Sequence, residues 1–140
     1  MKQLRNAKII TIIFHGFITI IAGHGMIVMC ISDVIFPYLL TTGELQFNFS
    51  LQHHSIKLIP WAMLCSFVGK AIIIASLFVS QKSWKYWLTI FGLILLPLSF
   101  GCILLSNEGS FFIISLLSGI PFALYFVWMV YLLYCSRETV

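Results

Sequence analysis

The amino-acid sequence alternates between long apolar runs and short polar stretches. Four of the runs are long enough to cross a bilayer as helices, because about 20 apolar residues span roughly 30 Å of hydrocarbon. They cover approximately residues 9–36, 58–80, 84–106 and 110–135. Short connections between the later runs favour antiparallel neighbours. The pattern therefore predicts an all-α membrane protein, in which residues 1–140 form a single antiparallel bundle of four transmembrane helices.

Composition and charge refine this picture. The chain is 61% hydrophobic and 9% charged, with a mean hydropathy of +1.06, which excludes a water-soluble core. One side of the predicted bundle carries Lys2, Arg5, Lys8, Lys82, Lys85 and Arg137, and the other carries only Lys57. The positive-inside rule therefore predicts cytoplasmic N- and C-termini in a bacterial-type inner membrane. Charges placed in this way indicate orientation and give no reason to expect nucleic-acid binding.

The connection between the first two predicted helices is the longest, and this orientation makes it extracytoplasmic. Pro37 is expected to end the first helix. Residues 45–52 then alternate apolar and polar side chains, which is the period of a β-strand. A short strand, or an extended segment lying among the headgroups, fits this pattern.

A single lysine interrupts the second run. Lys70 lies near the centre of residues 58–80, where a charged side chain costs about 2.5–3.5 kcal/mol on insertion scales. At about 100° per residue, the helix face of Lys70 also carries Ser66 and Gly69, whereas the opposite face is apolar. We therefore expect Lys70 to point into the protein. A lysine that extends to the headgroups is the alternative.

Counting depth at about 1.5 Å per residue brings other polar groups to the level of Lys70. Two prolines, Pro97 and Pro121, also lie near this level, and each frees a backbone carbonyl that protein or water must satisfy in lipid. We predict a ligand- or ion-binding site lined by Lys70, His24, Ser99 and Ser118. A proton relay through Lys70 and His24, an anion held by Lys70, and ordinary packing roles are all compatible with this arrangement.

Small residues indicate packing surfaces. Gly16 and Gly23 share one face of the first run, and Gly69 adjoins Lys70, so neighbouring helices can approach closely there. Near the outer boundary, Asp33 is expected to pair with Lys57 and to fasten the first two helices. Such surfaces on a small chain favour a homo-oligomer, or a membrane-protein partner, within the lipid bilayer.

The cysteines offer a weaker metal alternative. Four cysteines occur singly, with no C-x-x-C pair. Cys30, Cys65 and Cys102 fall near the outer face and could hold a soft metal such as copper(I), although cysteine commonly serves as a small hydrophobic residue. A b-type haem would need a dimer, because one chain lacks embedded histidines on two helices. We expect no cofactor and, without a catalytic motif, no enzyme.

Three functional hypotheses remain. The leading one is a small binding or transport unit that uses a polar site around Lys70 and His24. The second is a non-transporting interaction protein, such as an accessory subunit of a membrane complex or an immunity-type protein, in which the long link and the helix surfaces carry the role. The third is a haem- or metal-binding redox subunit.

Overall fold

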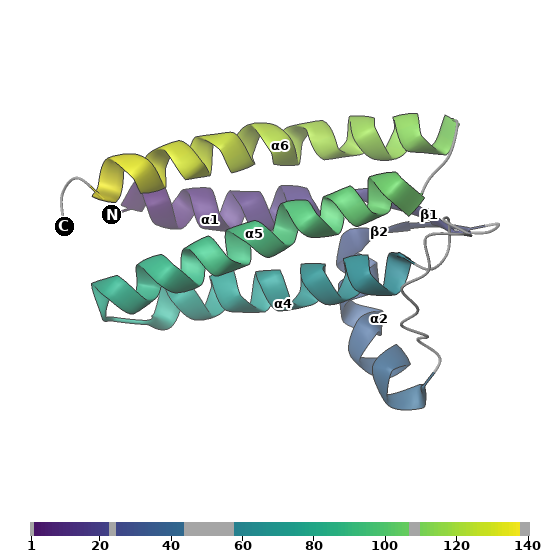
Figure 1. Ribbon diagram of the computed structural model, residues 1–140, viewed down its shortest axis with the longest axis horizontal. Coiled ribbons are helices and arrows are strands. Elements are labelled where there is room, and N and C mark those ends of the chain that lie inside the picture. Colours follow the sequence, from purple (N-terminus) through teal and green to yellow (C-terminus); the bar gives the residue numbers. More distant parts are fainter. Residues whose placement is uncertain (1, 23–24, 44–57, 107–109, 138–140) are drawn as a thin grey trace.

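The computed structural model describes residues 2–22, 25–43, 58–106 and 110–137 (Figure 1). These residues form five helices and a two-stranded antiparallel sheet. The elements in chain order are α1 (Lys2–Gly16), β1 (Thr19–Ala22), β2 (Gly25–Val28), α2 (Met29–Thr42), α4 (Ile59–Phe78), α5 (Lys82–Ser106) and α6 (Ser110–Arg137).

Three of the helices are long and apolar enough to cross a membrane. The candidate spans are Ile59–Phe78, Lys82–Ser106 and Phe111–Cys135. They coincide closely with the predicted helices at 58–80, 84–106 and 110–135, because each apolar run is bounded by turn residues or by aromatic residues typical of the membrane interface. The prediction of a helical protein with several helices that could span a membrane is therefore confirmed.

The prediction of one spanning helix over residues 9–36 is wrong. α1 ends at Gly16, and the chain continues as the hairpin β1–β2 and then as α2. β-branched residues concentrate in both strands, and only two residues, Gly23 and His24, lie between them in the sequence, a spacing typical of a hairpin. Hydropathy measures only how apolar such residues are, so it does not show that their side chains favour strands. The described residues contain three candidate spans, so the predicted bundle of four transmembrane helices is not confirmed.

The second prediction for this region concerns Pro37 and is also wrong. Pro37 lies inside α2, and the helix continues to Thr42. Gly43 follows with a φ of 72°, the left-handed conformation that glycine adopts without strain at a helix C-terminus.

Two serine side chains of α6 form hydrogen bonds with the backbone of the hairpin. Thr19 pairs with Val28 and Ala22 with Gly25 across the two strands. The outer edge of β1 contacts two serines, because the Thr19 N–H donates to Ser118 Oγ at 3.0 Å and Ser115 Oγ donates to the Thr19 carbonyl at 2.7 Å. Open strand edges are costly in hydrocarbon, so these hydroxyls allow a hairpin to lie against a membrane helix.

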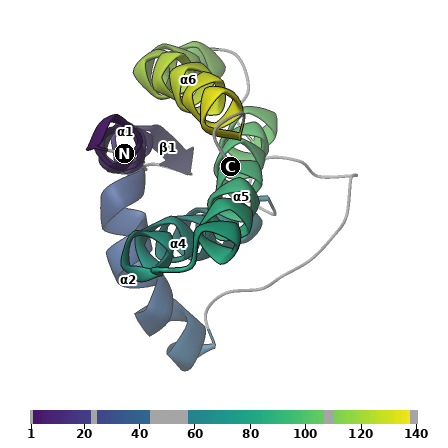
Figure 2. The ribbon, with the colours of Figure 1, turned by 90° about the vertical axis from the view of Figure 1, so that its left-hand side faces the viewer.

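α1, α4, α5 and α6 run along one common axis, whereas α2 leaves the bundle at a steep angle (Figures 1 and 2). α4 packs mainly against α5, and α1 packs mainly against α6. α1 begins and α6 ends at the same end of the bundle, and the hairpin lies at the other (Figure 1). α1 and the hairpin together therefore extend from one end of the bundle to the other (Figure 1).

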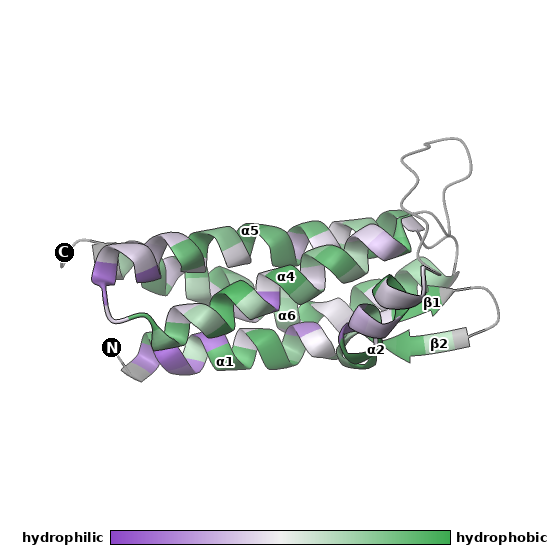
Figure 3. Cartoon of the chain, turned by 90° about the horizontal axis from the view of Figure 1, so that it is seen from below, coloured by the Kyte–Doolittle hydropathy of each residue, from purple (hydrophilic) through white to green (hydrophobic). Residues whose placement is uncertain are grey.

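The inward face predicted for the second run is confirmed in α4. Ser66, Gly69, Lys70 and Ile73 are buried, whereas Phe78 on the opposite face is 81% exposed. Hydrophilic positions gather at the end of the bundle where α1 and α5 begin (Figure 3). The helix surfaces between the two ends are largely apolar, as expected for contact with lipid.

Candidate functional site

Lys70 points into the protein and forms an ion pair. Its side chain is 10% exposed, and its ammonium group donates to the Asp33 carboxylate from α2. Ser66, one turn before Lys70 on α4, donates to the other oxygen of that carboxylate at 2.7 Å. The alternative of a lysine extended to the headgroups is therefore not observed.

Asp33 has a different partner from the predicted one. The sequence paired it with Lys57, but the structure pairs it with Lys70, and Lys57 lies outside the described residues. The prediction assumed one straight helix, which would place Asp33 near the outer boundary. The hairpin instead turns the chain, and α2 then carries Asp33 beside the middle of α4.

Sequence reasoning missed the histidine at this level, which is His15. Its ring is fully buried, and its Nε2 donates to the Leu96 carbonyl at 3.2 Å. The ring also meets Phe122 edge to face, with centroids 4.8 Å apart. Among the described residues its Nδ1 has no hydrogen-bond partner. His15 therefore lies between the residues that adjoin Pro97 and Pro121.

The neighbouring Gly16 brings α1 close to the ion pair. A Cβ at this position would lie 3.2 Å from the Cys30 Cβ and 4.0 Å from Lys70 Nζ. Gly16 therefore permits close packing, in agreement with its predicted structural role. As a result α1, α2 and α4 meet around the Lys70 ammonium.

The remaining predicted lining residues are not gathered around Lys70. His24 and Gly23 lie outside the described residues. Ser118 binds the backbone of β1 and donates to the Ser115 carbonyl at 3.0 Å, which is a structural role. Ser99 is fully buried on α5, and within the described part of the chain its hydroxyl has no hydrogen-bond partner.

The three-thiol metal site is not assembled in the described residues. No group of three or more His, Cys, Asp or Glu side chains there could hold a metal ion. Cys30 is exposed, whereas Cys65 and Cys102 are half-buried, and all are free thiols. A shallow groove of about 300 Å³ on α6 is lined by Leu124, Tyr125 and Trp128 and includes neither Lys70 nor Asp33.

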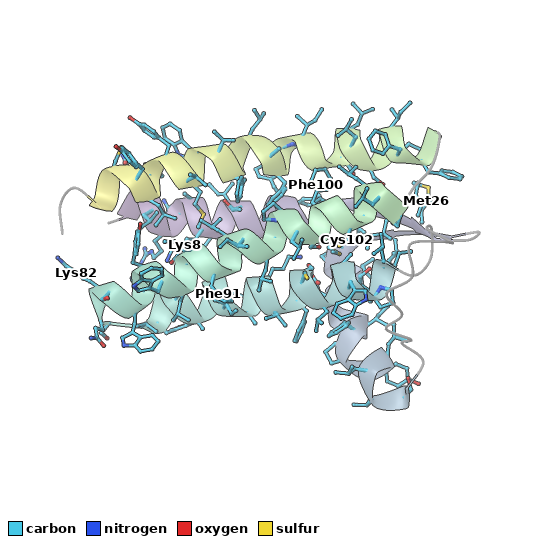
Figure 4. All side chains as sticks on the ribbon, in the orientation of Figure 1. Lys8, Met26, Lys82, Phe91, Phe100 and Cys102 are labelled. Carbon is cyan, nitrogen blue, oxygen red and sulfur yellow. The ribbon has the colours of Figure 1, made fainter. Side chains whose placement is uncertain are left out.

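Lys8 of α1 is a second buried cation. In the sequence, it is only one of the basic residues that predict the orientation in the membrane. Its side chain is 1% exposed and points in among the helices (Figure 4). Lys8 Nζ donates to Ser76 Oγ at 2.8 Å and to Thr89 Oγ1 at 2.5 Å. Ser76 donates in turn to the Ile73 carbonyl at 2.6 Å, and Thr89 donates to the Lys85 carbonyl at 2.6 Å. The two hydroxyls are therefore oriented with their lone pairs toward the ammonium.

Lys8 belongs to none of the three candidate spans, and its environment disfavours its charge. Burial and the nearby Lys85 ammonium lower the pKa of Lys8 to about 8. No signal in the sequence distinguished Lys8 from Arg5, one turn earlier, which remains exposed. Only the meeting of α1 with Ser76 and Thr89 makes Lys8 a candidate functional residue.

The lowered pKa of Lys8 makes stability depend on pH. A lysine in the unfolded chain titrates near 10.5, so between pH 8 and 10.5 the unfolded state binds more protons and stability rises with pH. In neutral detergent without anionic lipid, the free energy of unfolding should increase between about pH 7 and about pH 9.5 more in the wild type than in Lys8→Met. Denaturant titrations at both pH values measure this difference. Parallel changes in the two proteins would contradict it.

Three helices that could span a membrane, one of which carries the buried cation of an ion pair, indicate a membrane-embedded protein. No protein-family model, curated protein or solved structure matches this chain. Its function must therefore be argued from the site itself.

Proposed function

We propose that the protein is a small multi-pass membrane unit that binds and passes protons at the layer of Lys70 and Asp33. The proposal is carried by one observation, a lysine–carboxylate pair 10% and 13% exposed in the middle of a bundle of apolar helices. Ionisable groups at this depth are costly and commonly serve proton or ion pathways. Both N- and C-termini are placed in the cytoplasm of a bacterial-type inner membrane, on the strength of the basic residues at that end.

The groups around the pair have the chemistry that proton exchange requires. Asp33 can accept a proton, and Ser66 and Lys70 hold its two carboxylate oxygens as hydrogen-bond donors. His15 lies on the adjoining helix, where burial and the nearby Lys70 ammonium favour the neutral ring, and its Nδ1 has no partner among the described residues, so this nitrogen can accept a hydrogen bond beside the pair. In this proposal Asp33, Lys70 and His15 replace the predicted pair of Lys70 and His24.

Proton flux into vesicles tests the proposal. Purified protein is reconstituted in vesicles that contain a pH-sensitive dye, and a potassium gradient with valinomycin supplies the driving potential. Wild-type vesicles should change internal pH several-fold faster than empty vesicles. The neutral double variant Asp33→Leu/Lys70→Met should lose this flux, because it has neither the proton acceptor nor the cation.

The choice of variants separates function from folding. Lys82→Met serves as the matched control, since Lys82 is exposed at the start of α5 and points away from the bundle (Figure 4). This control should retain the wild-type flux. Wild-type vesicles that are no faster than empty ones, or a double variant that conducts normally, would refute the proposal.

The second candidate, an interaction protein without transport, is favoured by α2. This helix is apolar on several sides and leaves the bundle, and Val34 is 78% exposed and Tyr38 is 64% exposed. Exposed apolar surface of this kind can meet lipid or a partner helix. An inactive wild type in the flux experiment would favour this candidate. Oligomerisation remains a proposal on the same grounds.

A further inference from the structure

A second polar site lies at the end of the bundle where the chain begins, away from the ion pair of Lys70. It consists of Lys8, Lys85, Ser76 and Thr89, contributed by α1, α5 and α4. Ser76 lies within one turn of the end of α4, and Thr89 within two turns of the start of α5. The site is therefore close to the headgroup level of a membrane crossed by these helices.

The charges of this site are unbalanced. The Lys8 and Lys85 ammonium groups are close enough to repel each other. Asp33 is the only acidic residue in the ranges that the structure describes, and it pairs with Lys70. A buried charge without a counter-ion is strongly unfavourable, and two neighbouring cations increase the cost. An anion next to Lys85 would supply the missing counter-ion and offset the repulsion between the two lysines.

The hydrogen bonds of Lys8 leave one of its donor protons without an acceptor among the described residues. An ammonium group has three protons to donate. The described residues accept two of them, through Ser76 and Thr89. The hydrogens of these two hydroxyls are already directed to backbone carbonyls, so they fix the position of the ammonium. Lys85 is half-buried and can therefore contact a ligand at the surface, and its charge is close enough to act on Lys8.

We propose that Lys8 and Lys85 form a binding site for the phosphate group of an anionic membrane lipid at this end of the bundle. The lipid phosphate contacts Lys85, and the buried Lys8 ammonium adds its positive charge to the site from within the bundle. Anionic headgroups bind basic pockets between membrane helices in this way. The other basic residues at this end, including Arg5 and Lys82, increase the local concentration of anionic lipid but lie outside the site.

Thermal unfolding with defined lipids tests this site. Delipidated protein in neutral detergent is supplemented with phosphatidylglycerol or with the same amount of phosphatidylcholine. Phosphatidylglycerol should raise the wild-type Tm by at least about 3 °C relative to phosphatidylcholine, because a ligand that binds only the folded state stabilises it. Lys8→Met and Lys85→Met should each lose most of this shift. Lys82→Met, with an exposed lysine on the same helix, should keep it.

The outcomes distinguish the sources of the anion. If inorganic phosphate at millimolar concentration and matched ionic strength reproduces the shift, the site stands and free phosphate is its ligand. If Lys8→Met does not fold, Lys85→Met decides the question, since this substitution preserves the carbonyl that orients Thr89.

Three results would overturn the site. The first is a wild type that phosphatidylglycerol does not stabilise. The second is an equal loss of the shift in Lys82→Met, which would indicate only general surface charge. The third concerns Glu138, which follows the last residue of α6 in the sequence. If Glu138→Gln lowers the Tm while the lipid has no effect, the counter-ion is the protein's own carboxylate.

Discussion

Lys70→Met should lower the free energy of unfolding by about 3–5 kcal/mol, because it leaves the Asp33 carboxylate buried without its cation. Asp33→Leu should cost a similar amount, since it leaves Lys70 charged beside apolar helices. The double variant Asp33→Leu/Lys70→Met should lose far less than the sum of the two, because it removes both charges together. The measurement is unfolding in mixed micelles of neutral detergent and sodium dodecyl sulfate.

This comparison is a double-mutant cycle on one ion pair. Lys82→Met is the control for loss of a lysine and should change the free energy of unfolding by less than about 0.5 kcal/mol, because its side chain is exposed. Strict additivity of the two single changes would mean that Lys70 and Asp33 do not stabilise each other. The contact between α2 and α4 would then depend on apolar packing alone.

Gly92→Ala should lower the free energy of unfolding by about 1–3 kcal/mol, because it forces α4 and α5 apart. A Cβ on Gly92 would lie 2.5 Å from Ile73 Cγ1 and 2.9 Å from the Gly69 carbonyl oxygen. The second of these atoms belongs to the backbone and cannot turn away. The same micelle titration measures the effect.

Gly101 provides a matched control on the same helix. A Cβ at Gly101 would meet nothing within 4 Å, so Gly101→Ala should be neutral or stabilising by up to about 1 kcal/mol through helix propensity. Equal effects at the two positions would show that close packing at Gly92 contributes nothing. Gly69 was predicted from sequence to be a packing residue, and its contact with the backbone of α5 agrees with this role.

The sequence predicted the later part of the fold better than the first. In α4, α5 and α6, hydropathy and helical periodicity act together, so the ends of the spans and the inward direction of Lys70 could be predicted. Between Gly16 and Met29 the two signals conflict, because the residues are apolar enough for a span but their β-branched side chains favour strands. Hydropathy alone cannot resolve this conflict.

The same error affected the candidate site. A depth count at about 1.5 Å per residue fails once the chain becomes extended, because strands rise by about 3.3 Å per residue. His24 was therefore assigned a depth that counts the residues of β1 as helical, while His15 was left out of the predicted site. Asp33 was assigned to Lys57 for the same reason. Lys8 could not be identified, because its burial depends on contacts with α4 and α5, far along the chain.

The contacts of α1 and the hairpin imply an order of assembly. Their polar groups bind Ser76, Thr89, Leu96, Ser115 and Ser118, all of which are synthesised later. Until these partners are in the bilayer, the backbone groups at the edge of β1 have no hydrogen-bond partner in lipid. Insertion of the hairpin before them would therefore be unfavourable. We therefore expect α1 and the hairpin to be synthesised first but to reach their final position in the membrane last, after α4, α5 and α6 have been inserted.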